Sequence, residues 1–140
     1  MKFPYLRLPG QPDPTLRPYV PAHFFYKDKR TPDILFLIDS GSDYTYADYT
    51  IAVWLGIDLT GIEPVESYAA NNQTFESYPY GIGLALGSYE LKIPVLFTEN
   101  FGREGLLGEE VFFDKFRVIF ERYKWSTQLV PHMNRKNDIY

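Results

Sequence analysis

The most informative stretch of the sequence is Leu35-Phe36-Leu37-Ile38-Asp39-Ser40-Gly41-Ser42-Asp43. The apolar run, which begins at Ile34, is typical of a strand buried on both faces. It delivers one carboxylate, Asp39, to the end of that strand, where Gly41 permits a sharp turn and the close approach of another chain. Ser40 can anchor such a loop by hydrogen bonding. Asp-Ser-Gly is also ordinary turn chemistry, so the stretch alone leaves both a plain turn and a functional loop open.

The segments on either side of this loop predict an all-β fold. A long hairpin is expected over residues 65–80, with its tip at Asn71-Asn72, because asparagine tolerates the left-handed backbone of tight turns. A short helix should begin at Asp48, a favoured N-cap, and stop at Gly56. A helical turn is expected over 109–116. The eleven prolines and ten glycines suit the many turns of a β fold. Further strands are expected at 20–26, 34–38, 82–86, 91–97, 117–120 and 127–130.

The length of 140 residues predicts one domain with two flanking segments. Residues 1–18 form a proline-rich N-terminal arm, 19–130 the folded domain, and 131–140 a polar C-terminal tail. Proline lacks the N–H that a sheet ladder needs, so the arm is expected to be extended or to lie at a sheet edge, not in a central strand.

Composition argues against several classes of function. The net charge is −4 and no basic patch stands out, which disfavours nucleic acid as a partner. The chain has no cysteine and two histidines, His23 and His132, too few for a zinc site or a plausible Ser-His-Asp triad. The longest purely apolar run, 34–38, is far too short to cross a membrane, and the N-terminal residues do not resemble a signal peptide. We therefore expect a cytoplasmic protein with no membrane partner.

A second motif supports a functional loop at Asp39. Leu106-Leu107-Gly108 is a short apolar segment that ends in glycine and precedes the expected helical turn. With the Asp-Ser-Gly loop and the intervening hairpin, it resembles the retropepsin family of aspartic proteases, the single-domain homodimeric relatives of pepsin, over about residues 19–130. The resemblance implies a closed β-barrel of the acid-protease type, with a flap hairpin and one or two short helices.

The same resemblance implies an aspartic endopeptidase, a hydrolase in which Asp39 from each of two chains forms a dyad that activates water. The implied partners are a second copy of the chain and a peptide or protein substrate, and neither a cofactor nor a metal is needed. The residues implied to support the catalytic loop are Ser40, Gly41 and Gly108. Those implied to bind substrate are Gly41, Asp43, Ala70, Asn71 and Asn72.

The chain departs from the family pattern at three places. Ser42 stands where alanine is common, the hairpin tip lacks the usual glycines, and Glu109 stands where viral members carry an arginine that pairs with the acid equivalent to Asp43. These departures leave two alternatives open. One is a catalytically inactive binding or dimerisation module on the same fold, and the other is an unrelated β-barrel in which Asp39 is only a turn residue.

Overall fold

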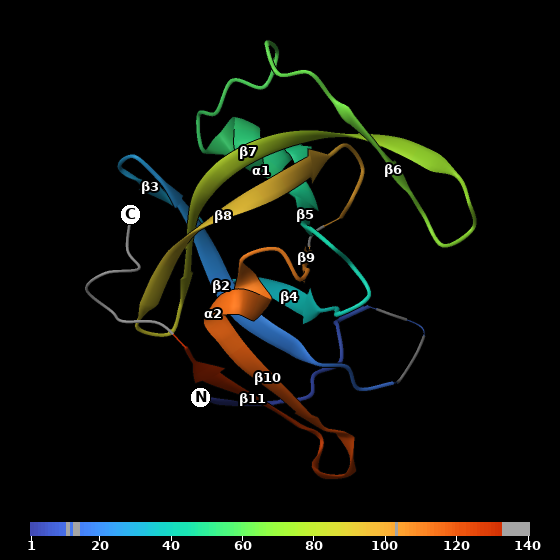
Figure 1. The fold of residues 1–140 in the computed structure, drawn as a ribbon, viewed down its shortest axis with the longest axis vertical. Helices are drawn as coiled ribbons and strands as arrows, with labels where there is room; N and C mark the ends of the chain where they lie inside the picture. The colour runs from blue at the N-terminus through green and yellow to red at the C-terminus, as the bar shows by residue number, and fades with distance from the viewer. Residues whose placement is uncertain (11, 13–14, 103, 133–140) are drawn as a thin grey trace.

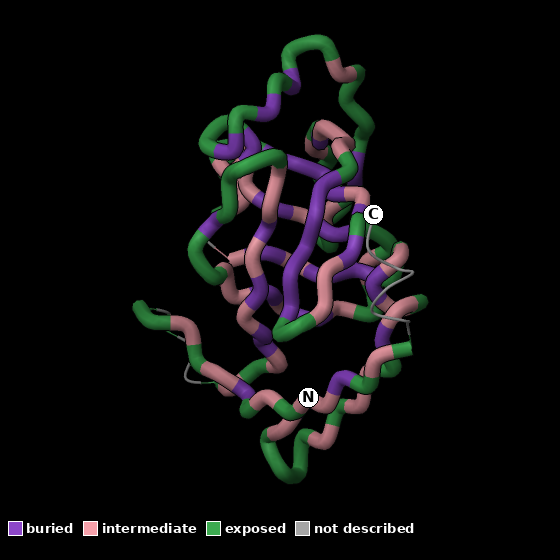
Figure 2. Tube along the Cα trace, turned by 90° about the vertical axis from the view of Figure 1, so that its left-hand side faces the viewer, coloured by how far each residue is buried: buried purple, intermediate pink, exposed green. Residues whose placement is uncertain are grey.

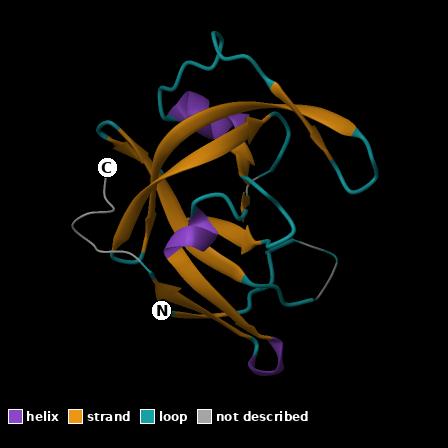
Figure 3. Cartoon of the chain, in the orientation of Figure 1, coloured by secondary structure: helices purple, strands orange, loops and turns teal. Residues whose placement is uncertain are grey.

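The computed structural model describes residues 1–10, 12, 15–102 and 104–132. Within these residues the chain is mostly strand, with two short α-helices and one 3₁₀ turn (Figure 3). The all-β prediction is confirmed. In chain order the elements are β1 (Lys2–Pro4), β2 (Tyr19–Tyr26), β3 (Lys29–Arg30), β4 (Ile34–Ile38), β5 (Thr45–Asp48), α1 (Tyr49–Trp54), β6 (Val65–Tyr68), β7 (Thr74–Leu86), β8 (Tyr89–Thr98), β9 (Gly105–Leu107), α2 (Phe112–Lys115), β10 (Phe116–Glu121), η1 (Arg122–Lys124) and β11 (Ser126–Pro131).

Six strands close into a barrel in the order β2, β4, β9, β5, β8 and β7, and β7 returns to pair with β2 (Figure 1). The pairs β4–β9 and β5–β8 are parallel, whereas the others are antiparallel. Closure removes the unpaired edges that an open sheet would expose. The parallel β4–β9 pair brings the carboxyl ends of both strands to the same rim of the barrel, where Ile38 lies opposite Leu107. The predicted closed barrel is confirmed.

Aromatic rings pack among aliphatic side chains in the interior of the barrel. Phe24 is fully buried, and its ring packs edge-on against Phe36 at 5.3 Å and against Phe97 at 6.2 Å between centroids. Burying one such side chain contributes about 1.5–3 kcal/mol relative to leaving it exposed. In Figure 2 the buried stretches run along the central strands, while the loops and hairpin tips are exposed. The packed interior thus holds together the barrel strands, and the Asp39 loop lies at the rim of that barrel.

A separate three-stranded sheet, in the order β1, β11 and β10, lies beside the barrel (Figure 1). Its edge strand β1 comes from the proline-rich segment, and Pro4 lies opposite Ser126. This position agrees with the expectation that the segment occupies a sheet edge, since proline donates no ladder hydrogen bond there. The limits proposed for the arm, domain and tail stay predictions, and residues 133–140 of the tail lie outside the described part of the chain.

Several local predictions are confirmed by the structure. The strand over 34–38 matches β4, and α1 has Asp48 as its N-cap, with the carboxylate accepting a hydrogen bond from the Thr50 N–H. The hairpin is formed by β6 and β7, which pair from Val65 opposite Ser77 to Tyr68 opposite Thr74.

Other local predictions are wrong because tertiary pairing decides them. β7 is one continuous strand where two separate strands were expected, and β5 and β9 were not predicted as strands. The helical turn over 109–116 shrinks to α2. Its predicted first residues lie outside the helix because Val111 adopts a positive φ of 68°, while the Glu109 and Glu110 N–H groups donate to carbonyls of the Asp39 loop. Among the described residues, no helix has the length and apolar character that a membrane span requires.

Candidate active site

The Asp39 loop continues directly from the buried strand β4. The Asp39 N–H donates to the Leu107 carbonyl at 2.9 Å, which extends the β4–β9 ladder by one residue. The chain then turns, with the Ser42 N–H donating to the Asp39 carbonyl at 3.3 Å. The Gly41 N–H donates to Asp39 Oδ1 at 2.8 Å. One oxygen of the carboxylate is therefore oriented by the backbone, and the half-buried side chain stays accessible at the barrel rim.

The segment that follows β9 braces this loop from behind. The Glu109 N–H donates to the Ser42 carbonyl and the Glu110 N–H to the Asp43 carbonyl, each at 2.8 Å. The buried Gly108 N–H donates to Thr45 Oγ1 at 3.3 Å. A Cβ on Gly108 would lie 2.1 Å from the Tyr44 carbonyl oxygen, so only glycine fits there. The two sequence motifs, distant along the chain, therefore pack against each other.

The hydrogen bonds from the Glu109 and Glu110 N–H groups matter because Glu109 stands where viral retropepsins carry an arginine. That arginine is absent at this position, and the side chains of Asp43, Glu109 and Glu110 are all exposed. Main-chain hydrogen bonds hold the loop in this chain, and they do not depend on the charge of any side chain. The substitution to glutamate therefore leaves the loop itself well supported.

A groove of about 940 Å³ runs from the Asp39 loop across β5 to the β6–β7 hairpin. Of the residues assigned by resemblance, the structure places Asp39, Gly41, Asp43 and Ala70 on its wall. Ser40, Asn71, Asn72 and Gly108 are not among the lining residues. The groove is lined by Asp39, Gly41, Ser42, Asp43, Tyr44, Tyr46, Val65, Glu66, Ser67, Tyr68, Ala69, Ala70, Phe75, Pro79, Leu96, Phe101 and Leu106.

The two asparagines at the hairpin tip serve the turn itself. Asn71 Oδ1 accepts a hydrogen bond from the Gln73 N–H at 3.0 Å, and Asn72 adopts a positive φ of 62°. The Asn72 N–H donates to the Ala69 carbonyl at 3.0 Å. Asparagine therefore does here what glycine does in other tight turns, as the sequence predicted. Both side chains are exposed, and their suggested contact with substrate stays a prediction.

Sequence reasoning missed the apolar floor of the groove. Tyr46 in β5 lies opposite Leu96 of β8 and opposite Leu106 of β9, and Leu96 lies opposite Pro79 of β7. All four line the groove, as do the rings of Phe75 and Phe101. The signal in the sequence was the alternation of aromatic and polar residues around Tyr46. That pattern predicts a strand with an aromatic face but not what the face covers.

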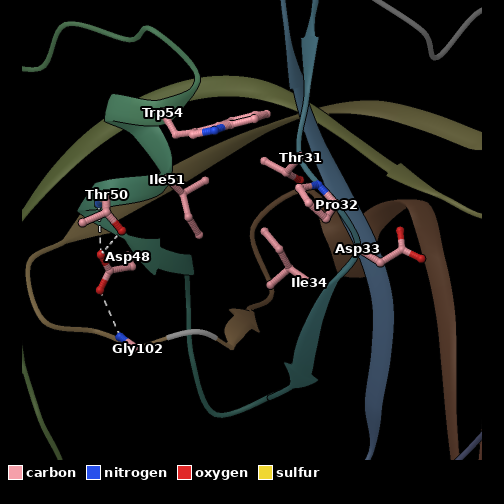
Figure 4. Close-up of a pocket in the computed structure, with 9 residues that line it drawn as sticks. All are labelled: Thr31, Pro32, Asp33, Ile34, Asp48, Thr50, Ile51, Trp54 and Gly102. Carbon is pink, nitrogen blue, oxygen red and sulfur yellow. Dashed lines mark hydrogen bonds between the residues drawn. The ribbon is translucent and has the colours of Figure 1, made fainter.

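A second cavity, of about 670 Å³, lies near the opposite end of β4, between the start of that strand and α1 (Figure 4). Its walls are mainly apolar, with Ile34, Ile51 and Trp54 prominent. Two acids, Asp33 and Asp48, line it, and Asp48 accepts hydrogen bonds from the Thr50 and Gly102 N–H groups at 2.9 and 3.0 Å. Burial raises the pKa of Asp48, but these hydrogen bonds outweigh burial and hold the pKa below its usual value. This carboxylate is a structural anchor.

No set of three or more His, Asp or Glu side chains within the described residues is arranged to hold a metal ion. The chemistry that the groove offers comes from carboxylates. Three acids line the groove, Asp39, Asp43 and Glu66, and the carboxylate of Asp39 is oriented by a backbone N–H of its own loop. A single chain supplies one copy of that loop.

A closed six-stranded barrel, with a hairpin beside an Asp-Ser-Gly loop at its rim, is the retropepsin-like fold of aspartic proteases, and the chain has this fold. A similar solved structure is a retropepsin-like aspartic protease from Rickettsia conorii, with a TM-score of 0.64 and 20% sequence identity. The alignment covers 92% of this chain and 89% of that one. No protein-family model and no curated protein sequence matches the chain. The resemblance is therefore confirmed at the level of the fold.

Proposed function

We propose that the chain is an aspartic endopeptidase that acts as a homodimer, with Asp39 from each copy forming the catalytic dyad. One observation carries the proposal: Asp39 lies on a backbone-fixed loop at the end of β4 and opens onto a groove of about 940 Å³ beneath a hairpin. A purely structural turn residue does not need this setting. The retropepsin-like fold of the whole chain supports the same conclusion.

The chemistry requires two carboxylates, which explains the need for a second copy. On a two-fold axis each chain presents the same surface to the other, so one loop generates both halves of the site. Two carboxyl groups about 3 Å apart hold one proton between them, because both cannot ionise together. The ionised Asp39 takes a proton from water, and the protonated one donates a hydrogen bond to the peptide carbonyl. Water adds to the carbonyl carbon, and the Asp39 carboxyl that took the proton from water then gives it to the leaving amine as the C–N bond breaks.

Several features of the chain suit these steps. The Gly41 N–H fixes the direction of one Asp39 oxygen at 2.8 Å, which lowers the cost of orienting the acid during reaction. In the proposed dimer, the exposed Ser40 braces the two loops across the interface. Asp43 and the hairpin tip at Ala70 contact the main chain of the substrate, which lies along the groove.

The proposal is tested with Asp39→Asn and a matched control, Asp28→Asn, in the exposed β2–β3 turn. Both proteins are incubated with a mixed peptide library at several pH values, and the products are identified by mass spectrometry. The amide oxygen introduced by Asp39→Asn can still accept the Gly41 N–H, so folding should persist while cleavage falls at least about 10³-fold. The control should cleave as the wild type does. Cleavage by a well-folded Asp39→Asn protein would rule out Asp39 as the catalyst.

The oligomeric state is measured by sedimentation equilibrium over a concentration series at about pH 5 and pH 7.5. A reversible dimer supports the shared site. A monomer under every condition, with no cleavage by the wild type, would refute the mechanism and favour the inactive binding module on the same fold. The two measurements together therefore separate the candidate functions.

A further inference from the structure

One side chain links the floor of the groove to the hairpin above it. The Tyr46 hydroxyl donates a hydrogen bond to Ser67 Oγ at 3.1 Å, and the Tyr46 ring packs against Phe75 with centroids 5.9 Å apart. Ser67 in β6 lies directly opposite Phe75 in β7. A single β5 residue therefore contacts both strands of the hairpin at the same level. Ser67 is 9% exposed, so this contact is shielded from water.

The Tyr46 ring also packs against a second aromatic ring. It stacks on Phe101 with centroids 5.9 Å apart and an interplanar angle of 24°. Phe101 is held in place by its neighbour Gly102, whose N–H donates to Asp48 Oδ2 at 3.0 Å (Figure 4). Asp48 ends β5, two residues after Tyr46. The residues Asp48, Phe101, Tyr46 and Ser67 thus form a continuous line of contacts from the barrel to the hairpin.

The hairpin has little other sheet support at this level. β6 is the last strand of its sheet and pairs with β7 alone, while β7 joins the barrel through β8 only from Tyr78 onwards. A hydroxyl pair, Ser77 with Thr98, marks the base of the hairpin. Next to that base, Thr98 Oγ1 also donates to the Glu76 carbonyl at 3.4 Å, and beyond it Tyr46 contacts both hairpin strands, at Ser67 and Phe75.

We propose that Tyr46 is a positioning residue that holds the β6–β7 hairpin over the groove through its hydroxyl bond to Ser67 and its ring contact with Phe75. This inference rests on the proposed function for its meaning in catalysis. Tyr46 lines the same groove as Asp39, but its role is carried through the hairpin and not through the reacting atoms. When a substrate strand enters, the hydrogen bond between Tyr46 and Ser67 must break and re-form as the hairpin opens and closes.

The test compares Tyr46→Phe with a matched control, Tyr80→Phe. Tyr80 lies in β7, the longer hairpin strand, and its hydroxyl makes a hydrogen bond of the same length, 3.1 Å, with the Tyr26 hydroxyl, away from the groove. Hydrogen–deuterium exchange is measured for residues 65–77 in the substrate-free proteins. Loss of a bond worth about 0.5–1.5 kcal/mol should speed exchange of the hairpin amides about two- to tenfold in Tyr46→Phe. The control should leave these amides unchanged.

Ser67→Ala supplies the second arm, because it removes the acceptor and keeps the ring contacts. Its exchange should match that of Tyr46→Phe, and the double variant should exchange no faster than either single variant. Unchanged hairpin exchange in Tyr46→Phe, or additive effects in the double variant, would overturn the inference. Neither result depends on catalysis.

Peptide hydrolysis then separates the inference from the proposed function. If the wild type cleaves peptides, Tyr46→Phe should raise KM about two- to tenfold with a smaller change in kcat, since hairpin closure and not chemistry is altered. If the hairpin amides of Tyr46→Phe exchange faster but its KM for peptides is unchanged, the Tyr46–Ser67 contact does not influence substrate binding, and that part of the inference is overturned. If the hairpin amides exchange faster but neither the wild type nor any variant cleaves peptides, the positioning role of Tyr46 is supported and the proposed protease function is refuted.

Discussion

Gly108→Ala should break the packing that holds the Asp39 loop. The buried glycine lies where its new Cβ would meet the Tyr44 carbonyl oxygen at 2.1 Å, the Tyr44 carbonyl carbon at 2.5 Å and the Ser42 carbonyl oxygen at 2.7 Å. These are backbone atoms, which cannot rotate aside as a flexible side chain would. The Tyr44 segment or the end of β9 must therefore move.

The cost follows from what that movement disrupts. Overpacking a well-filled site costs about 1–3 kcal/mol. The shift also strains the hydrogen bonds that run from the N–H groups of Gly108, Glu109 and Glu110 to the Asp39 loop and to Thr45. Each bond contributes about 0.5–1.5 kcal/mol, and losing one or two brings the total to about 1.5–6 kcal/mol. That is a large share of the roughly 5–15 kcal/mol that keeps a domain folded.

Urea denaturation followed by far-ultraviolet circular dichroism measures this loss. The control is Gly61→Ala, at an exposed turn where an added Cβ meets nothing within 4 Å and φ is not positive. Gly61→Ala should change the free energy of unfolding by less than about 1 kcal/mol, because only the unfolded-chain entropy is affected. If Gly108→Ala proved as stable as Gly61→Ala, the close packing of the two loops would be refuted.

Two further predictions concern anchors elsewhere in the barrel. Phe24→Ala should cost about 3–5 kcal/mol of stability, because the fully buried ring leaves a cavity beside Phe36 and Phe97, whereas Phe120→Ala, at a ring 42% exposed, should cost far less in the same urea titration. Asp48→Asn should destabilise the protein at pH 7 because the loss of charge weakens the hydrogen bonds to Thr50 and Gly102. Since the folded-state pKa of Asp48 lies below its ordinary value of 3.8, its contribution is present above that pH and is lost as the pH falls through the folded value. The stability gap between wild type and Asp48→Asn should therefore narrow in urea titrations below about pH 4, and a gap unchanged between about pH 7 and pH 3 would contradict this assignment.

The features that could be predicted from the sequence are those whose causes are local. The apolar run into Asp39, the N-cap at Asp48 and the turn at Asn71-Asn72 each depend on neighbouring residues, and all three are found in the structure. Strand β9 could not be found this way. Its three residues gain a ladder only because β4 and β5 flank them, and Gly105 is required there because a Cβ would lie 2.2 Å from the Phe36 ring.

The prediction of a helical turn that begins at Glu109 was also wrong at its start, because contacts with another part of the chain decide the local conformation. Glu109 and Glu110 are reasonable residues for a first helical turn, where the dipole favours acids. Their N–H groups would have no acceptor inside a helix that starts there, and they donate to the Ser42 and Asp43 carbonyls. The helical backbone is interrupted at Val111, whose φ is 68°. A sequence pattern describes the conformation that a segment favours by itself, and packing against another part of the chain can override it.

The residues of the candidate site also differ in whether the sequence alone can identify them. Asp39 could be selected from its own neighbours, since a buried strand that ends in an acid and a glycine is a local pattern. Tyr46 could not, because its bond to Ser67 spans 21 residues and its stack on Phe101 depends on the parallel pairing of β5 with β8. A residue that performs chemistry can be marked by its immediate sequence, whereas a residue that positions one segment over another is defined only by the register that brings the segments together. The contact between Tyr46 and the hairpin could therefore be found only in the structure. Removing the single Tyr46 hydroxyl group is the most direct test of this part of the site.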